Sequence, residues 1–231
     1  MSDAAKRAAA EAAAALVQPG MVVGLGSGST VVHLVNALGR RVREQRLRIT
    51  GIPTSTETEV LARANEIPLT DLDATDIDLA IDGADEVETG TLRLIKGLGA
   101  ALLREKIVVQ SSRRFVVVAD ASKVVPTLGA RAPLPVEVVR FGHGATARKL
   151  TALGGAPVLR LDAAGAPRVT DGGNYIFDCA GFAPIRDPFT LQRQLKTIAG
   201  VVESGLFLGC AERAIIGAGD GTVSIMRPHG D

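Results

Sequence analysis

The sequence predicts an α/β protein in which a mostly parallel sheet carries helices on both faces. Three observations support this prediction. Short apolar runs of strand length alternate with helix-forming stretches over residues 21–119. Most of these runs end in a loop rich in glycine, hydroxyl or charged side chains, and the 231-residue chain is long enough for one large domain or two small ones. Alternating strands and helices build parallel sheets that are covered on both faces.

The first unit opens with a helix and then alternates. The alanine-rich residues 4–17 are strong helix formers and end before Pro19-Gly20. Hydrophobic periodicity then predicts these elements in order: strand 21–25, helix 31–43, strand 48–52, helix 57–65, strand 77–81, strand 92–95, helix 100–111 and strand 115–119. We expect all five strands in one Rossmann-like sheet.

A Pro-rich segment, residues 126–135, marks the start of a second unit. Its expected elements are strand 136–139, helix 145–153, strand 158–161, strand 174–179, helix 190–198 and strand 201–203. This order is the split βαβ arrangement and predicts a smaller, ferredoxin-like α+β lid domain. Residues 206–226 are strand-like and are expected to return to the first sheet. The expected domains are therefore 1–128 with 205–231, and 129–204.

Composition and charge exclude several classes of function. The 26 basic and 25 acidic residues give a net charge of +1, which offers no broad positive field for nucleic acid or anionic lipid. Aromatic residues make up 3% with no Trp, which argues against stacking platforms for nucleic acid. No stretch approaches the roughly 18 uncharged apolar residues of a membrane span. We therefore expect neither a nucleic-acid nor a membrane partner.

The cysteines and histidines argue against a disulfide framework and a histidine-based metal site. Cys179 and Cys210 match no paired metal-ligand spacing, so a cytoplasmic location is expected. His33, His143 and His229 are scattered along the chain.

Five loops at expected strand ends carry the candidate chemistry: GSGST, PTST, DGADE, KGLG and DASK. Ligands of open parallel sheets bind beyond the carboxyl ends of the strands, so these loops are expected to converge. Glycines beside hydroxyls at a helix start present N–H groups and the positive end of the helix dipole to an anion, which predicts phosphate binding at the first loop. That loop matches neither the dinucleotide fingerprint nor the ATPase phosphate loop.

Charged residues of the next loops suggest acid–base chemistry. Asp82, Asp85 and Glu86 repel one another unless a cation or sugar hydroxyls compensate, so a magnesium site and a hydroxyl-binding site are both open. Lys96 lies on a glycine turn, and Glu105 and Lys106 both flank the apolar face of the following helix. Periodicity does not decide which of these two side chains turns inward.

Seven segments carry a resemblance to a known family: GLGSGST, TST, DGADE, KGLGAALLREK, ADASK, PLPVEV and TDGGNYIFD. Their order and approximate spacing resemble ribose-5-phosphate isomerase of the A type over nearly the whole chain. The resemblance implies that Glu105 is the proton-transferring base and that Asp82, Asp85 and Lys96 surround the reactive end of the sugar. The substrate-binding residues that it implies are Ser27, Gly28, Ser29, Thr30, Asp82, Gly83, Ala84, Asp85, Lys96, Gly97, Leu98, Gly99 and Lys123.

Two residues depart from the family pattern, and a third matches it more weakly. Ser27 stands where a Thr is common, which conserves the hydroxyl, and Leu98 stands where a Gly is frequent. Lys6 on the first helix aligns with a basic residue that can approach phosphate.

The resemblance implies interconversion of D-ribose 5-phosphate and D-ribulose 5-phosphate in the non-oxidative pentose phosphate pathway, by a proton shift between C2 and C1 through a cis-enediolate. In this mechanism Lys96 and loop N–H groups stabilise charge on the carbonyl oxygen, and Asp82 accepts a hydroxyl proton during ring opening. Ser29, Thr30 and Lys123 hold the phosphate. No metal or other cofactor is expected. The family favours dimers or tetramers, so a homo-oligomer that binds a sugar phosphate is expected.

Two alternatives remain for the function. A non-catalytic sugar-phosphate sensor needs the anion loop but has no use for a carboxylate base, and no helix-turn-helix candidate precedes the first strand. An aminosugar-phosphate deaminase needs a catalytic histidine, for which His33 is the candidate.

Overall fold

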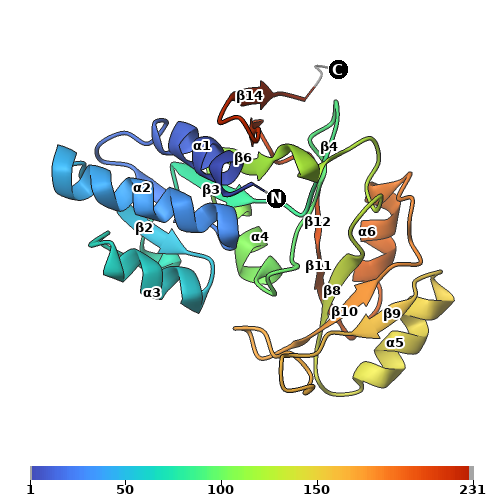
Figure 1. The fold of residues 1–231 in the computed structure, drawn as a ribbon. Coiled ribbons are helices and arrows are strands. Elements are labelled where there is room, and N and C mark those ends of the chain that lie inside the picture. The colour runs from blue at the N-terminus through green and yellow to red at the C-terminus, as the bar shows by residue number, and fades with distance from the viewer. Residues whose placement is uncertain (1, 229–231) are drawn as a thin grey trace.

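A six-stranded sheet forms the centre of the larger lobe in the computed structural model, which describes residues 2–228 (Figure 1). Its strand order is β14-β13-β6-β3-β1-β2, and all neighbours are parallel except β13 and β14. The strands are β1 (Val22–Leu25), β2 (Thr50–Pro53), β3 (Leu79–Gly83), β6 (Phe115–Asp120), β13 (Arg213–Gly217) and β14 (Val223–Met226). The tail therefore returns to this sheet through β13 and β14, as the strand-like pattern of residues 206–226 predicts.

Helices cover both faces of this sheet, which confirms the predicted fold class. The helices of the larger lobe are α1 (Asp3–Ala14), α2 (Ser29–Gln45), α3 (Thr56–Ala64) and α4 (Leu102–Gln110). Val116 and Val118 of β6 pack in a core with α1 and α2, whereas Val117 packs on the opposite face with Val108 of α4. Side chains alternate between the faces of a strand, so the uninterrupted apolar run of β6 follows from this double coverage.

The predicted strand at residues 92–95 lies outside the central sheet, contrary to expectation. It is the short strand β5 (Leu94–Ile95), in a second sheet of order β12-β5-β4-β7 with β12 (Leu206–Phe207), β4 (Glu86–Glu88) and β7 (Val124–Val125). β5 runs antiparallel to both β4 and β12. Two neighbouring strands run parallel only when a crossover of about a dozen or more residues, usually a helix, connects them. The segment 84–93 between β3 and β5 is short and contains no helix, so β5 cannot join the central sheet beside β3 as a parallel strand.

The smaller lobe has the ferredoxin-like arrangement that its element order predicts. It contains β8 (Leu134–Val138), α5 (His143–Ala152), β9 (Pro157–Leu159), β10 (Tyr175–Cys179), α6 (Pro188–Lys196) and β11 (Val201–Ser204). The sheet order is β11-β8-β10-β9, with antiparallel neighbours, and apolar side chains of β8, β10, α5 and α6 share one core. In Figure 1 helix α4 and strand β12 lie between this lobe and the larger one.

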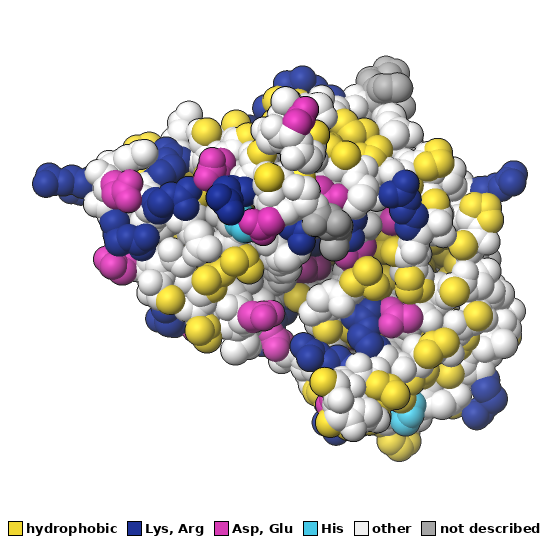
Figure 2. All heavy atoms as spheres, in the orientation of Figure 1, with side chains coloured by type: hydrophobic (Ala, Val, Ile, Leu, Met, Phe, Trp, Pro, Cys, Tyr) yellow, Lys and Arg dark blue, Asp and Glu magenta, His cyan; other side chains and the backbone are white. Residues whose placement is uncertain are grey.

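Two further observations concern the length of the helices and the charge of the surface. No helix within residues 2–228 is long and apolar enough to cross a membrane. Figure 2 shows basic and acidic side chains interspersed over the visible face, in keeping with the net charge of +1. Of the three histidines, His229 lies outside the described residues.

Glu86 of β4 anchors the segment that leads into the smaller lobe. Its buried carboxylate accepts backbone N–H bonds from Gly129 at 2.6 Å, Arg131 at 2.6 Å and Ala132 at 2.8 Å. Glu86 is 0% exposed, so water does not replace these bonds. The last carboxylate of the DGADE loop therefore has a structural role.

We expect Glu86→Ala to destabilise the fold, because it removes the buried acceptor of three backbone N–H groups, of which that of Ala132 is buried and those of Gly129 and Arg131 are partly buried. Urea unfolding should show a loss of at least about 1–3 kcal/mol, the cost of one buried unpaired donor. Glu86→Gln, which keeps the volume and one acceptor oxygen, should lose less. Glu57→Ala on the exposed side of α3 is the control. Equal stability of Glu86→Ala and this control would show that the three bonds contribute little.

Candidate active site

A pocket lies where the carboxyl ends of β1, β3 and β6 meet the loop after β5. Four of the five predicted loops line it, the exception being PTST. The lining residues are Lys6, Ser27, Gly28, Ser29, Thr30, Gly83, Ala84, Asp85, Lys96, Gly97, Gly99, Glu105, Asp120 and Lys123. The expected convergence of loops beyond strand ends therefore occurs, although β5 contributes its loop from a different sheet.

Three buried charged side chains form a cluster at the pocket, which Lys96 and Glu105 line and beneath which Asp82 lies. The Lys96 ammonium lies 2.9 Å from Oδ2 of Asp82 and 3.2 Å from Oε2 of Glu105, and it donates to the carbonyl of Gly83 at 2.7 Å. Asp82, Lys96 and Glu105 are only 1%, 2% and 4% exposed. Charged groups this deeply buried persist in a fold only when they are paired.

Close backbone packing places Asp82. Its Oδ1 accepts N–H bonds from Ser27 at 3.0 Å and from Gly83 at 2.7 Å. A Cβ at Gly26 would lie 2.1 Å from the Asp82 carboxyl carbon, so only glycine allows the two strand ends to approach this closely. The first glycine loop thus shapes the carboxylate cluster and also lines the pocket.

The PTST loop does not line the pocket but hydrogen-bonds to the glycine loop. The Ser27 hydroxyl is 2.8 Å from the Thr54 hydroxyl and donates to the Ser55 hydroxyl at 2.8 Å. Thr58 Oγ1 donates to the Gly26 carbonyl at 2.8 Å. Thr54, Ser55 and Thr58 are buried, so this hydroxyl network holds the backbone of the loop in place.

Burial and charge perturb the titration of the cluster. Burial, reinforced by the nearby Asp82 carboxylate, raises the pKa of Glu105 to about 8. Burial also raises the pKa of Asp82, against the opposing effects of Lys96 and two backbone N–H bonds. Burial alone would lower the pKa of Lys96, but the Asp82 and Glu105 carboxylates outweigh it and the pKa rises. Lys96 therefore stays protonated, while Glu105 can exchange a proton near neutral pH.

Both Glu105 and Lys106 turn inward, which periodicity did not decide. Helix α4 is buried on two sides, because it packs against β3 of the central sheet and β11 of the smaller lobe. Glu105 faces the pocket, and Lys106 donates to Oε1 of Glu203 at 2.9 Å and to the Ser204 carbonyl at 2.7 Å. Burial lowers the pKa of Lys106, partly offset by Glu203.

Most of the predicted binding residues line the pocket, and two do not. Asp82 lies beneath the lining as part of the buried cluster. The Leu98 side chain is 43% exposed, and its N–H donates to Oδ2 of Asp85 at 2.9 Å. Leu98 therefore contributes by fixing Asp85 and the backbone of the loop.

Two cations and the N-terminus of α2 also line the pocket. Lys6 donates to the Ser29 hydroxyl at 2.8 Å, and Lys123 lies in the short 3₁₀ segment Ala121–Lys123. Gly28 precedes α2 with φ +99°, and the first N–H groups of a helix have no intrahelical partners.

Sequence reasoning missed Asp120, which lines the pocket and whose Oδ1 accepts from the Ser122 N–H at 2.9 Å. Its position just before the predicted Lys123 was the available signal.

The DGADE carboxylates do not converge as metal ligands. Asp82 pairs with Lys96, Asp85 accepts from Leu98, and Glu86 accepts three backbone bonds elsewhere. Within residues 2–228 no cluster of three or more His, Cys, Asp or Glu side chains is suited to hold a metal ion. The arrangement instead favours the hydroxyl-binding interpretation of this loop.

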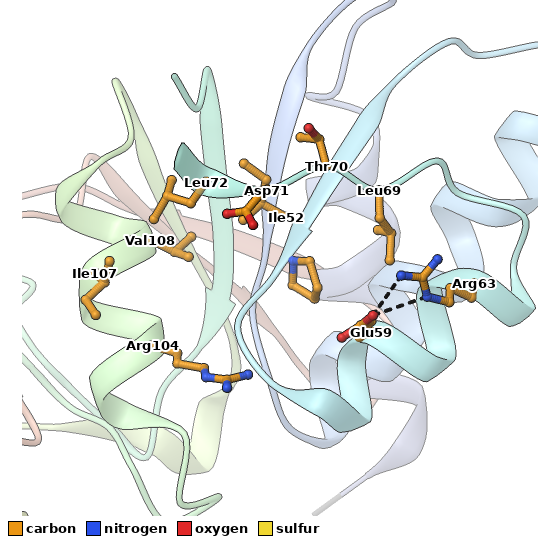
Figure 3. Close-up of a pocket in the computed structure, with 11 residues that line it drawn as sticks. Ile52, Glu59, Arg63, Leu69, Thr70, Asp71, Leu72, Arg104, Ile107 and Val108 are labelled. Carbon is orange, nitrogen blue, oxygen red and sulfur yellow. Dashed lines mark hydrogen bonds and ion pairs between the residues drawn. The ribbon is translucent and has the colours of Figure 1, made fainter. Parts of the chain in front are cut away.

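Figure 3 shows a second hollow, between α3 and α4 at the β2 edge of the central sheet. Glu59 and Arg63, paired at 2.8 Å, lie on one side, and Arg104 and Ile107 lie on the other. Its titratable lining residues are Glu59, Arg63, Asp71 and Arg104, and none of them is buried. This hollow lacks the paired, desolvated charges that characterise the first pocket.

The fold and the first pocket define a class of protein: an α/β enzyme that moves a proton on a small anionic substrate. A desolvated carboxylate with a pKa of about 8 beside a permanent ammonium provides a base and an electrophile. A sensor has no need of such a pair.

Comparisons with known proteins identify the family. The sequence model of ribose 5-phosphate isomerase A (phosphoriboisomerase A) matches residues 50–221. Ribose-5-phosphate isomerase A of Roseiflexus castenholzii is 54% identical over 225 residues, covering 96% of this chain and 95% of the relative. That of a Synechococcus strain is 52% identical over 221 residues, covering 95% of this chain and 96% of the relative.

Solved structures of the same family have the same fold as this chain. The Methanocaldococcus jannaschii ribose 5-phosphate isomerase A has a TM-score of 0.91 and 43% identity, covering 96% of this chain and 97% of that one. A D-ribose-5-phosphate isomerase in complex with phospho-erythronic acid has a TM-score of 0.92 and 38% identity, also covering 96% of this chain and 97% of its own. The chain belongs to the ribose 5-phosphate isomerase A family. The predicted family, enzyme class and isomerase function are therefore confirmed, and the sensor alternative is not favoured.

Proposed function

We propose that this chain interconverts D-ribose 5-phosphate and D-ribulose 5-phosphate by moving a proton between C2 and C1 through a cis-enediolate. The observation that carries the proposal is the buried Asp82–Lys96–Glu105 cluster at a pocket that Lys6 and Lys123 also line. A sugar phosphate needs both the reactive cluster and the cations, because its phosphate is separate from its reacting carbons. The relative that was solved with phospho-erythronic acid supports a phosphorylated sugar-like ligand.

Glu105 is the proposed base. It lines the pocket, and burial raises its pKa to about 8, close to working pH, where a general base is most effective. Its Oε2 accepts no hydrogen bond of normal geometry within residues 2–228, although the Lys96 ammonium lies 3.2 Å away. Glu105 can therefore accept the proton from one carbon and return it to the next.

Lys96 is the proposed electrophile. The raised pKa keeps its ammonium charged, so it acts as a donor to the oxygen on which negative charge develops and not as a proton acceptor. Its contacts with Asp82, Glu105 and the Gly83 carbonyl hold the ammonium in place before substrate arrives. A preorganised donor in a dry site stabilises developing charge at little reorganisation cost.

Ring opening needs a carboxylate that accepts the proton of the ring hydroxyl. Asp82, the residue predicted for this step, lies in the buried cluster, and Asp85 lines the pocket with Oδ2 bound to the Leu98 N–H. We propose that the two share the polar recognition of the reactive end. Ser29, Thr30 and Lys123 bind the phosphate, with Lys6 held near them through Ser29. Binding energy at the phosphate then serves to position the distant carbons.

The pKa of Glu105 sets the expected pH dependence. The base must be deprotonated, so kcat/KM should rise about tenfold per pH unit at low pH and level off above about pH 8. Initial rates over a pH series at subsaturating ribose 5-phosphate check this. Residual activity of Glu105→Gln should lack the rise. A flat profile from about pH 6 to pH 8 would show that no group with this pKa acts as the base.

The direct test of the function is an isomerase assay with ribose 5-phosphate after exhaustive chelation. We expect ribulose 5-phosphate to form at the same rate before and after chelation, because the proposed mechanism uses only protein groups. Activity that disappears with the chelator and returns with Mg²⁺ would revive a metal role for the DGADE loop. No activity under either condition would overturn the proposed function.

The deaminase alternative has weak support. His33 Nε2 lies 2.9 Å from Asp3 Oδ1, where α1 meets α2, and His33 does not line the pocket. An aminosugar phosphate offered in the same assay distinguishes the two activities by ammonia release.

Three further properties belong to the proposal. We propose that residues 1–128 with 205–231 form the catalytic domain and 129–204 the lid domain, in line with the separate sheets. A homodimer or homotetramer is proposed from the family resemblance. The free cysteines Cys179 and Cys210 support a cytoplasmic location.

A further inference from the structure

The loop that follows Lys96 has a backbone that cannot hold its shape unaided. Gly97 has φ +109° and Ala100 has φ +65°, both in the left-handed region. For alanine this conformation is sterically costly, so the surroundings must impose it. Gly97 and Gly99 line the pocket, so the shape of this loop is also the shape of one pocket wall.

Two charged side chains hold this loop from opposite sides. On the pocket side, Asp85 Oδ2 accepts the Leu98 N–H at 2.9 Å. On the other side, the guanidinium of Arg160 donates from Nη1 to the carbonyl of Gly97 at 2.7 Å and to that of Leu98 at 3.1 Å. Arg160 directly follows β9, so it reaches the loop from the smaller lobe.

Arg160 is itself held by Asp178 of β10. Its Nε donates to Oδ2 of Asp178 at 2.9 Å, and Nη2 donates to Oδ1. The paired side chains are only 13% and 24% exposed, so solvent screens the forked ion pair weakly. The planar fork leaves Nη1 directed at the two loop carbonyls, which a lysine ammonium at this position would not reproduce.

From these contacts we infer that Arg160, oriented by Asp178, is a positioning residue that fixes the Gly97–Gly99 segment for substrate binding. The inference rests on the proposed function, because it assigns a role to that same pocket wall. The reacting groups Lys96 and Glu105 precede and follow this segment in the chain. The smaller lobe thus contributes to the site through the backbone of the larger lobe, without touching the substrate itself.

The test compares Arg160→Met with the wild type and with Arg168→Met. Arg168 is exposed, and its backbone N–H bonds to the Arg160 carbonyl at 2.9 Å, so it loses the same charge in the same part of the smaller lobe. We expect Arg160→Met to lower kcat/KM for ribose 5-phosphate by about 10- to 100-fold, because small misplacements of binding groups cost about that much. Arg168→Met should match the wild type.

Amide hydrogen exchange distinguishes a positioning role of Arg160 from a general role in stability, because only a positioning role predicts faster exchange confined to the loop. Exchange at Leu98, Gly99 and Ala100 should become at least about tenfold faster in Arg160→Met, with the strands of the smaller lobe unchanged. Asp178→Asn should show a smaller effect in the same direction, and adding it to Arg160→Met should cost little more, because Asp178 acts through Arg160. If Arg160→Met does not fold, Arg160→Lys carries the same measurements.

Two results would overturn the inference. One is kcat/KM of Arg160→Met within about twofold of the Arg168→Met control. The other is lost activity accompanied by faster exchange throughout the smaller lobe with no excess at residues 98–100, which would make Arg160 a general stabilising residue. An inactive wild-type protein would instead contradict the proposed function. In that case the exchange measurement still decides whether Arg160 fixes the loop.

Discussion

Glu105→Gln should lower kcat by about 10²–10⁴-fold while leaving KM nearly unchanged. The substitution removes the proton acceptor but keeps the volume of a side chain that is 4% exposed. General-base catalysis contributes a factor of this size. In the proposed mechanism substrate affinity depends mainly on the residues that bind the phosphate, so it should survive. Initial-rate kinetics with ribose 5-phosphate, together with titration of phospho-erythronic acid, measure the two properties separately.

Two further variants define the outcome for Glu105. Glu105→Asp keeps a carboxylate and withdraws it from the carbon, so its rate should lie between those of the wild type and Glu105→Gln. Glu57→Gln on the exposed first turn of α3 should behave as the wild type. If Glu105→Gln retained more than about a tenth of the wild-type rate, Glu105 would no longer be a candidate for the base.

Lys96→Met should lower kcat by about 10²–10³-fold, the usual effect of removing one donor to a developing oxyanion. Methionine has a similar length and no charge. The loss also leaves Asp82 and Glu105 as neighbouring buried carboxylates without their shared ammonium, which should raise the pKa of Glu105 further. The residual activity should therefore keep rising with pH beyond about pH 8, where the wild type levels off, a shift that simple destabilisation would not produce.

The measurement for Lys96 is a pH–rate profile of Lys96→Met beside that of Lys149→Met. Lys149 is an exposed residue of α5, and its loss should change neither rate nor profile. A Lys96→Met variant with an unshifted profile would show that its ammonium does not interact with the base. A folded variant with near wild-type kcat would contradict the role of Lys96 as electrophile.

Much of the site was predictable because its parts occupy strand ends. Parallel strands bring their carboxyl ends to one edge, so loops that follow β1, β3 and β6 meet whatever their separation in the chain. The alternation of apolar runs and helices placed those ends within a few residues. The resemblance to the family then named Glu105 among the charged residues of α4, a choice that periodicity alone left open.

Other features needed contacts that the sequence does not display. Glu86 belongs to the same acidic loop as Asp82, yet it accepts N–H bonds from residues 129–132 because β4 turns it away from the pocket. Lys106 is buried as fully as Glu105, because α4 lies between two sheets. The role of Arg160 likewise depends on the smaller lobe lying against the loop after β5.

By itself, the sequence determined most of the succession of strands and helices and the loops that carry the chemistry, because these follow from local propensity and hydrophobic period. It did not predict the short strands β4 and β7. The tertiary structure alone decided which charges share a desolvated pocket. Burial and partner distance, which set the pKa of Glu105 and hold Lys96 between two carboxylates, depend on residues far apart in the chain. A local pattern contains no measure of these long-range distances.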